Sequence, residues 1–130
     1  MKYQPLTEQA IFTKVANHLM TQGKKSKGGT SCRYRSPDGL TCAVGCLIPK
    51  KAYTSDIEGA AINTLTDLYP AVARAAHIYG LDAEALGTLR RLQIIHDDEP
   101  VTSWAAKLRY LARDRMLDIS KVPKLAKGAK

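Results

Sequence analysis

Three cysteines and a histidine–aspartate pair are the residues of this sequence with the most specific chemistry. Cys32, Cys42 and Cys46 lie close together in the chain, and His96 is followed directly by Asp97. A thiolate is a strong nucleophile, and an imidazole that a carboxylate orients can accept the thiol proton. One hypothesis is therefore a cysteine-dependent enzyme. In it Cys42, in the first turn of a helix, is the nucleophile, His96 the base and Asp97 the orienting carboxylate.

The same residue types are also ligands of zinc. Structural zinc takes four nitrogen or sulfur ligands in a tetrahedral arrangement, and Cys32, Cys42, Cys46 and His96 would supply them. The spacing lacks the C-x2-C knuckle of common zinc ribbons, and the histidine comes from a distant part of the chain. The plainer interpretation is that the cysteines are small hydrophobic core residues. We expect no cofactor, with a small structural zinc module as the alternative.

The balance of charge is strongly positive and unevenly distributed. The 130 residues include 20 Lys and Arg against 12 Asp and Glu, a formal net charge of +8. Residues 1–53 carry nine basic and two acidic side chains, residues 54–99 three and eight, and residues 100–130 eight and two. Such a balance favours nucleic acid, acidic proteins or anionic membranes as partners. The alternative is that the acidic middle folds against the basic ends and cancels much of the field.

A contact surface rich in lysine, arginine and tyrosine is the third hypothesis. Basic side chains neutralise phosphates, and aromatic rings give stacking platforms for unpaired bases. A glycine- and lysine-rich segment, which is typical of an exposed loop, would contribute to this surface together with an arginine-rich strand and the last helix. The residues that we expect in the surface are Lys24, Lys25, Lys27, Arg33, Tyr34, Arg35, Lys50, Lys51, Arg109 and Arg113.

The elements that position these residues are predicted to be mainly α-helical. Thr7 is a suitable N-cap for a first helix, which Gly23 would end. Ser55–Glu58 has the pattern of a capping box and predicts a helix running towards Tyr69.

Further helices are predicted over residues 71–79, after the cap Asp82 and after the cap Thr102. Together these segments predict a compact domain of four to five helices. The residues that we expect in its core are Phe12, Val15, Leu19, Leu65, Leu89, Leu92, Trp104, Leu108 and Leu111.

One short β-hairpin is predicted after the first helix, near residues 31–42. Cys32–Arg35 alternates in polarity, Ser36–Gly39 has the composition of a type I turn, and Leu40–Cys42 would be the return strand. Residues 1–117 are expected to form a single domain, with residues 118–130 as a basic, flexible tail. No apolar run approaches the length of a membrane span, and the start lacks the pattern of a secretory signal, so we expect a cytoplasmic protein without membrane contact.

Residues 34–49, which read YRSPDGLTCAVGCLIP, resemble the core of a family of small phage and prophage proteins with no assigned reaction. Residues 92–97 and Trp104 with Leu108 are similar to later segments of that family, and residues 18–23 to its opening. The resemblance covers roughly residues 11–117, although Lys50 and Lys51 stand where the family has a more acidic stretch. It implies a phage or prophage setting rather than a mechanism.

The expected function is that of a non-enzymatic, phage-type accessory protein that acts by surface contact. Its partner would be nucleic acid or a host protein or nucleoprotein in the host cytoplasm. Interference with a host process, such as antiviral defence, would suit a protein of this size and setting. The zoned charge and the lack of a convincing catalytic motif are the grounds for this expectation.

Overall fold

The computed structural model describes residues 2–28 and 31–124. The chain there is mainly helical, as predicted, with five α-helices and two very short strands. These elements are α1 (Glu8–Gln22), β1 (Lys27–Gly28), β2 (Ser31–Cys32), α2 (Ile62–Leu68), α3 (Pro70–Ala75), α4 (Ala83–Asp98) and α5 (Trp104–Arg115). Four single turns of 3-10 helix, η1 (Gly45–Leu47), η2 (Lys50–Ala52), η3 (Ser55–Ile57) and η4 (Val101–Ser103), complete the order. No helix in these residues is both long and apolar enough to cross a membrane.

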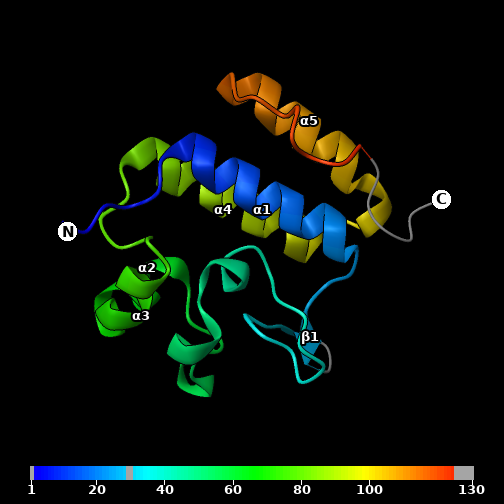
Figure 1. Cartoon of the computed structure of the whole chain (residues 1–130). Helices are drawn as coiled ribbons and strands as arrows, with labels where there is room; N and C mark the ends of the chain where they lie inside the picture. Colours follow the sequence, from blue (N-terminus) through cyan, green and yellow to red (C-terminus); the bar gives the residue numbers. More distant parts are fainter. Residues whose placement is uncertain (1, 29–30, 125–130) are drawn as a thin grey trace.

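The two long helices α1 and α4 lie side by side and form the centre of the fold (Figure 1). In this view α5 lies on one side of that pair, while β1, β2 and the helices α2 and α3 lie on the other. All nine residues predicted for the core are at most 1% exposed: Phe12, Val15, Leu19, Leu65, Leu89, Leu92, Trp104, Leu108 and Leu111. Apolar burial on this scale is the main stabilising contribution to such a fold.

Two of the predicted helix caps are confirmed by their hydrogen bonds. The hydroxyl of Thr7 accepts from the backbone N–H of Ala10 at 3.1 Å, and the carboxylate of Asp82 accepts from Ala85 at 2.8 Å. Gly23 ends α1 in the left-handed region, with φ of 63°. Each cap satisfies a backbone group that the helix cannot pair internally, and so fixes where the helix begins or ends.

Three other helix boundaries were predicted wrongly. Ser55–Glu58 does not open a long helix: it forms only the turn η3, and the carboxylate of Glu58 binds a different segment. The helix predicted over residues 71–79 ends at Ala75, because His77 is in the left-handed region with φ of 59°. Thr102 lies inside η4, and α5 begins without a side-chain cap.

The predicted hairpin does not form as an extended ladder. β1 and β2 pair with each other instead, and a single bridge between Arg35 and Thr41 closes the turn at residues 36–39. The backbone groups of Leu40 and Thr41 bond to side chains from elsewhere, among them the amide of Gln22. Because these backbone groups are already bonded to side chains, they are not available for the ladder of a regular return strand.

The predicted boundary of a flexible tail at residue 118 is also wrong. The side chain of Gln9 in α1 exchanges two hydrogen bonds with the backbone of Asp118, and Asn17 donates to the carbonyl of Lys121 at 2.8 Å. Val122 is buried against the core. Residues 118–122 therefore belong to the folded domain, and residues 125–130 lie outside the described residues.

Candidate functional site

A cavity of about 460 Å³ opens between α4 and the two chain segments that follow β2 and η3. From α4 it is lined by Arg90, Gln93, Ile94 and Asp97, which share one face of the helix because they recur at helical spacing. The other lining residues are Cys32, Arg33, Tyr34, Cys42, Val44, Glu58, Gly59, Ala60, Ala61, Ile62 and Asn63. Clefts of this volume are of the size that proteins use for small ligands.

His96 is fully buried beside this cavity, and both of its ring nitrogens are engaged. Its Nε2 accepts from the backbone N–H of Ser26 at 2.9 Å. The ring proton must therefore be on Nδ1, which lies 2.7 Å from Oδ1 of Asp97 and donates to it. Its ring also lies against the ring of Trp104. His96 thus orients Asp97 and attaches the loop before β1 to α4.

Asp97 is the polar centre of the site. Its Oδ1 accepts from His96 and, at 2.8 Å, from Nε2 of Gln93. Burial alone would raise the pKa of Asp97, but the hydrogen bonds from His96 and Gln93, with a smaller effect from Cys32, bring it below its usual value. The carboxylate is therefore ionised at neutral pH. The amide oxygen of Gln93 also accepts from the backbone N–H of Val44, which attaches the segment at Val44 to α4.

The cysteine next to this pair is Cys32, and not the Cys42 of the alternative cysteine-enzyme hypothesis. The Cys32 sulfur, a His96 ring nitrogen and an Asp97 oxygen lie within 4.8 Å of one another. Cys42 is only 2% exposed, its sulfur accepts from the N–H of Gly45, and burial raises its pKa to about 12. A buried thiol of this kind is a core residue rather than a nucleophile.

Cys32 is itself poorly activated. Burial raises its pKa, and the adjacent negative charge of Asp97 raises it further, so the thiol is protonated at neutral pH. The His96 nitrogens are occupied by Ser26 and Asp97, so neither of them is free to take the thiol proton. Cysteine, histidine and aspartate lie close together here, as they do in a cysteine enzyme. Their hydrogen bonds, however, do not let the histidine take the thiol proton, so no thiolate is generated.

The predicted zinc ligands are not brought together either. In the described part of the chain, the potential ligand group contains Cys32, His96 and Asp97 but neither Cys42 nor Cys46. Cys46 donates to the carbonyl of Ala43 instead. A metal on Nδ1 of His96 would displace its only ring proton while Nε2 still faces an N–H donor, which leaves an unfavourable imidazolate. The donor set therefore does not suit a metal ion.

Glu58 holds the two loop walls of the cavity together. One carboxylate oxygen accepts from the N–H of Tyr34 at 2.8 Å. The other accepts from the N–H of Arg35 at 3.1 Å and from the hydroxyl of Tyr53 at 2.6 Å. Arg33 lies 3.9 Å from the same carboxylate. This role was missed at sequence level, where Glu58 was interpreted as part of a capping box.

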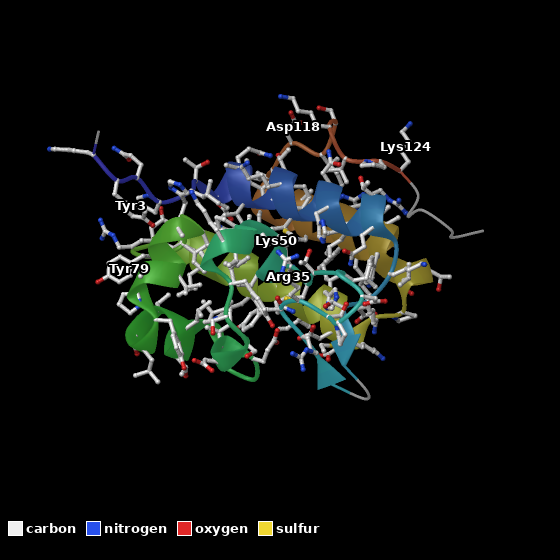
Figure 2. The ribbon with its side chains drawn as sticks, turned by 60° about the horizontal axis from the view of Figure 1, so that its bottom comes forward. Tyr3, Arg35, Lys50, Tyr79, Asp118 and Lys124 are labelled. Carbon is white, nitrogen blue, oxygen red and sulfur yellow. The ribbon has the colours of Figure 1, made fainter. Side chains whose placement is uncertain are left out.

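Six of the predicted basic residues form what we call the loop surface: Lys24, Lys27, Arg33, Arg35, Lys50 and Lys51. The Arg33 side chain covers Gly28, next to Lys27, and the Arg35 guanidinium lies 5.6 Å from the centre of the Tyr53 ring, next to η2. Figure 2 shows Arg35 and Lys50 on the same face of the molecule. Lys24, Lys27, Lys50 and Lys51 are exposed, and within the described residues none of these four lysines forms an ion pair.

The other residues predicted for the contact surface lie elsewhere. Tyr34 is only 8% exposed and donates its hydroxyl proton to the carbonyl of Ala60, so it cannot stack on a base. Lys25 is half-buried and donates to the backbone carbonyl of Asp97 at 3.1 Å. Arg109 and Arg113 are exposed on α5, on the opposite side of α1 from the loop surface (Figure 1). The structure therefore divides the predicted surface into two separate groups.

Sequence reasoning also missed Gln93, Arg90 and Asn63 as site residues. Arg90 donates to the side chain of Asn63 across the rim of the cavity. The spacing of Arg90, Gln93 and Asp97 was a usable signal, because it places three polar side chains on one helix face. Asn63 carried no comparable signal, since its position depends on how α2 packs.

Comparisons with protein-family models, with curated proteins and with solved structures each found no match for this chain. The function is therefore inferred from its residues and their arrangement.

Proposed function

We propose that this protein is a non-enzymatic accessory protein that binds the phosphate backbone of nucleic acid on its loop surface. The observation that carries this proposal is the set of four exposed lysines that form no ion pair with any described residue, placed beside two partly exposed arginines. Lysine and arginine neutralise phosphates and release counterions, which gives affinity without any need for base-specific contacts.

The distribution of acidic residues supports this choice. Glu58 lies within the surface, and its two oxygens are already occupied by the backbone of Tyr34 and Arg35 and by Tyr53. It therefore positions the arginines more than it neutralises the lysines. A phage or prophage setting, with action on a host process, belongs to the same proposal and rests on the motif at residues 34–49.

The test measures binding of labelled single- and double-stranded DNA and RNA by fluorescence anisotropy, between about 50 and 200 mM salt. The variant Lys50→Glu with Lys51→Glu changes the loop surface, and Arg109→Glu with Arg113→Glu is its matched control. Both pairs replace two exposed basic residues and change the net charge equally.

We expect the loop-surface variant to lower affinity about tenfold or more. It should reduce the slope of log affinity against log salt by about 2, because about 0.9 is lost for each phosphate contact. The α5 variant should change affinity much less. Equal losses in both variants would mean that only the net charge matters, and would contradict the proposal. Absence of salt-dependent binding would reject nucleic acid as the partner and leave an acidic protein in its place.

A further inference from the structure

We propose that the cavity between α4 and residues 32–34 binds one unpaired nucleobase that carries an exocyclic amino group, with that group donating to Asp97. This inference rests on the proposed function and extends it: the loop surface holds the phosphates, and the cavity accepts a base from the same strand. It predicts a preference for single strands, because the amino groups of paired bases are turned towards their partners.

The walls of the cavity suit a flat, largely apolar ring. Val44, Ala60, Ala61, Ile62 and Ile94 supply the apolar lining, and the exposed surface of the cavity is more apolar than polar, although six of its lining residues are charged or carry an amide. Its volume of about 460 Å³ is in the range of sites for ligands of nucleotide size. Apolar side chains of this kind pack on the faces of a base, which is sequence-tolerant because every base has two such faces.

Asp97 supplies the acceptor. Among the residues that the structure describes, the two N–H donors that reach its side chain, from His96 and Gln93, both bond to Oδ1, and the side chain remains 35% exposed. Oδ2 is left for a donor from a ligand or for the thiol of Cys32. An ionised acceptor held by two hydrogen bonds is well placed to select a donor group, because an opposing acceptor would be repelled.

Arginine at the rim connects the cavity to the loop surface. Arg33 lines the cavity and also belongs to the loop surface, and Arg90 lies across the opening with its guanidinium on Asn63. The positive charges of these two arginines are matched by the negative charges of the carboxylates Glu58 and Asp97 in the same lining. A simple cation or anion gains little there, whereas a nucleotide has a donor edge at one end and a phosphate at the other.

The test uses cytidine and uridine 5′-monophosphate with the full chain, followed by calorimetry or by NMR of the backbone amides. The two nucleotides match in size and charge, but cytosine has an amino group where uracil has a carbonyl oxygen. We expect cytidine monophosphate to bind about tenfold more tightly, as for one hydrogen bond to a charged group. Equal affinity for the two, or no binding of either, would overturn the inference.

The variant Asp97→Asn tests the role of the carboxylate more sharply. The amide oxygen can still accept from His96, while the new NH2 group offers a donor to the cavity. We expect the preference to shift from cytidine towards uridine monophosphate, so the affinity ratio of the two nucleotides is the readout. An unchanged ratio in a folded variant would contradict the contact with Asp97.

Ile94→Trp provides a second variant for the case that Asp97→Asn does not fold. Ile94 is 54% exposed and lines the cavity, so a larger ring there should block it without disturbing the core. We expect a loss of mononucleotide binding of about tenfold or more. Arg109→Glu on α5 is the control and should bind as the native chain does. Binding unaffected by Ile94→Trp would reject the cavity as the site.

The two proposals fail in different ways. Salt-dependent binding of oligonucleotides without discrimination between the mononucleotides would reject the cavity inference and leave the proposed function. Discrimination between mononucleotides, with oligonucleotide binding insensitive to Lys50→Glu and Lys51→Glu, would reject the loop surface as the backbone site.

Discussion

His96 determines what the neighbouring side chains can do chemically. Because Nε2 accepts from Ser26 and Nδ1 donates to Asp97, both ring nitrogens are occupied and the ring connects α4 to the loop before β1. The consequence for Cys32 is that it faces a carboxylate and no free base. The cysteine, histidine and aspartate therefore lie together without the hydrogen bonds that would activate the thiol.

The three cysteines should differ clearly in reactivity. Cys32 and Cys46 are partly exposed and Cys42 is buried, and burial raises the pKa of both Cys42 and Cys46 to about 12. At neutral pH we expect a disulfide reagent to modify Cys32 slowly, Cys46 more slowly because of its higher pKa, and Cys42 only after unfolding. The rate at Cys32 should rise with pH beyond the ordinary thiol pKa of about 8.5, since its own pKa is raised.

Mass spectrometry after timed labelling would check this order, with Cys32→Ser as the control that should remove the fastest modification of the folded protein. Rapid modification of Cys42 in the folded chain would contradict the burial described above, and fast reaction of Cys32 near pH 6 would restore the enzyme hypothesis.

At the scale of elements, α4 serves two purposes with two faces. Leu89, Leu92 and Ile95 turn to the core, and the adjoining face with Gln93 and Asp97 turns to the cavity. The 3.6-residue period makes this division possible within one helix. The site is thereby built on a rigid element that the core holds in place, which is what precise positioning of a ligand requires.

Two glycines in the elements around the cavity should respond oppositely to alanine. A Cβ at Gly45 in η1 would overlap the backbone carbonyl of Tyr34, whereas a Cβ at Gly87 in α4 meets no atom within 4 Å. We expect Gly45→Ala to destabilise the protein by about 1–3 kcal/mol or more, because the backbone must move. Gly87→Ala should stabilise it by about 0.5–1 kcal/mol through helix propensity.

Urea unfolding of the two variants measures both effects, with Gly87→Ala as the matched control for Gly45→Ala. Equal stability of Gly45→Ala and the native chain would mean that η1 and the segment at Tyr34 are not in close contact.

At the scale of the whole molecule, side-chain hydrogen bonds connect segments of the described fold that are far apart in the sequence. Glu8 in α1 accepts from Arg115 in α5 at 2.7 Å and from the hydroxyl of Thr88 in α4 at 2.6 Å. One carboxylate thus connects the beginning, the middle and the end of the described fold. Such charged hydrogen bonds are stronger than neutral ones, and an isolated surface ion pair would contribute less.

Acid should weaken this connection. The hydrogen bond from Arg115, together with a smaller effect of Thr88, lowers the pKa of Glu8 from its ordinary value of 4.5. A carboxyl group with a lowered pKa in the folded state stabilises the protein above its ordinary pKa and loses this effect as pH falls towards the folded-state value. We therefore expect the unfolding temperature to decrease below about pH 5.

Glu8→Gln should show a weaker decrease over the same pH range, because the amide of the introduced glutamine does not titrate. Asp97, whose pKa is also lowered, retains part of the dependence in that variant. An identical pH profile for the native chain and Glu8→Gln would exclude a contribution from Glu8.

The caps Thr7 and Asp82 and the core residues could be predicted from the sequence because they depend on neighbours along the chain. The Thr7 hydroxyl accepts from Ala10, only three residues further along the chain, and the apolar spacing of Leu89 and Leu92 follows from helix geometry alone. The same local information identified His96, Asp97 and the basic residues as candidates, by their chemistry.

Which candidates meet was decided by contacts between distant segments. Glu58 has the right spacing for a capping box, yet its carboxylate pairs with backbone groups 23 and 24 residues away, which outweighs the local pattern. Cys32 and not Cys42 lies beside Asp97 because the chain just before β1 attaches to His96 through Ser26. A backbone N–H donor to a histidine leaves no trace in residue types, so only the folded chain reveals it.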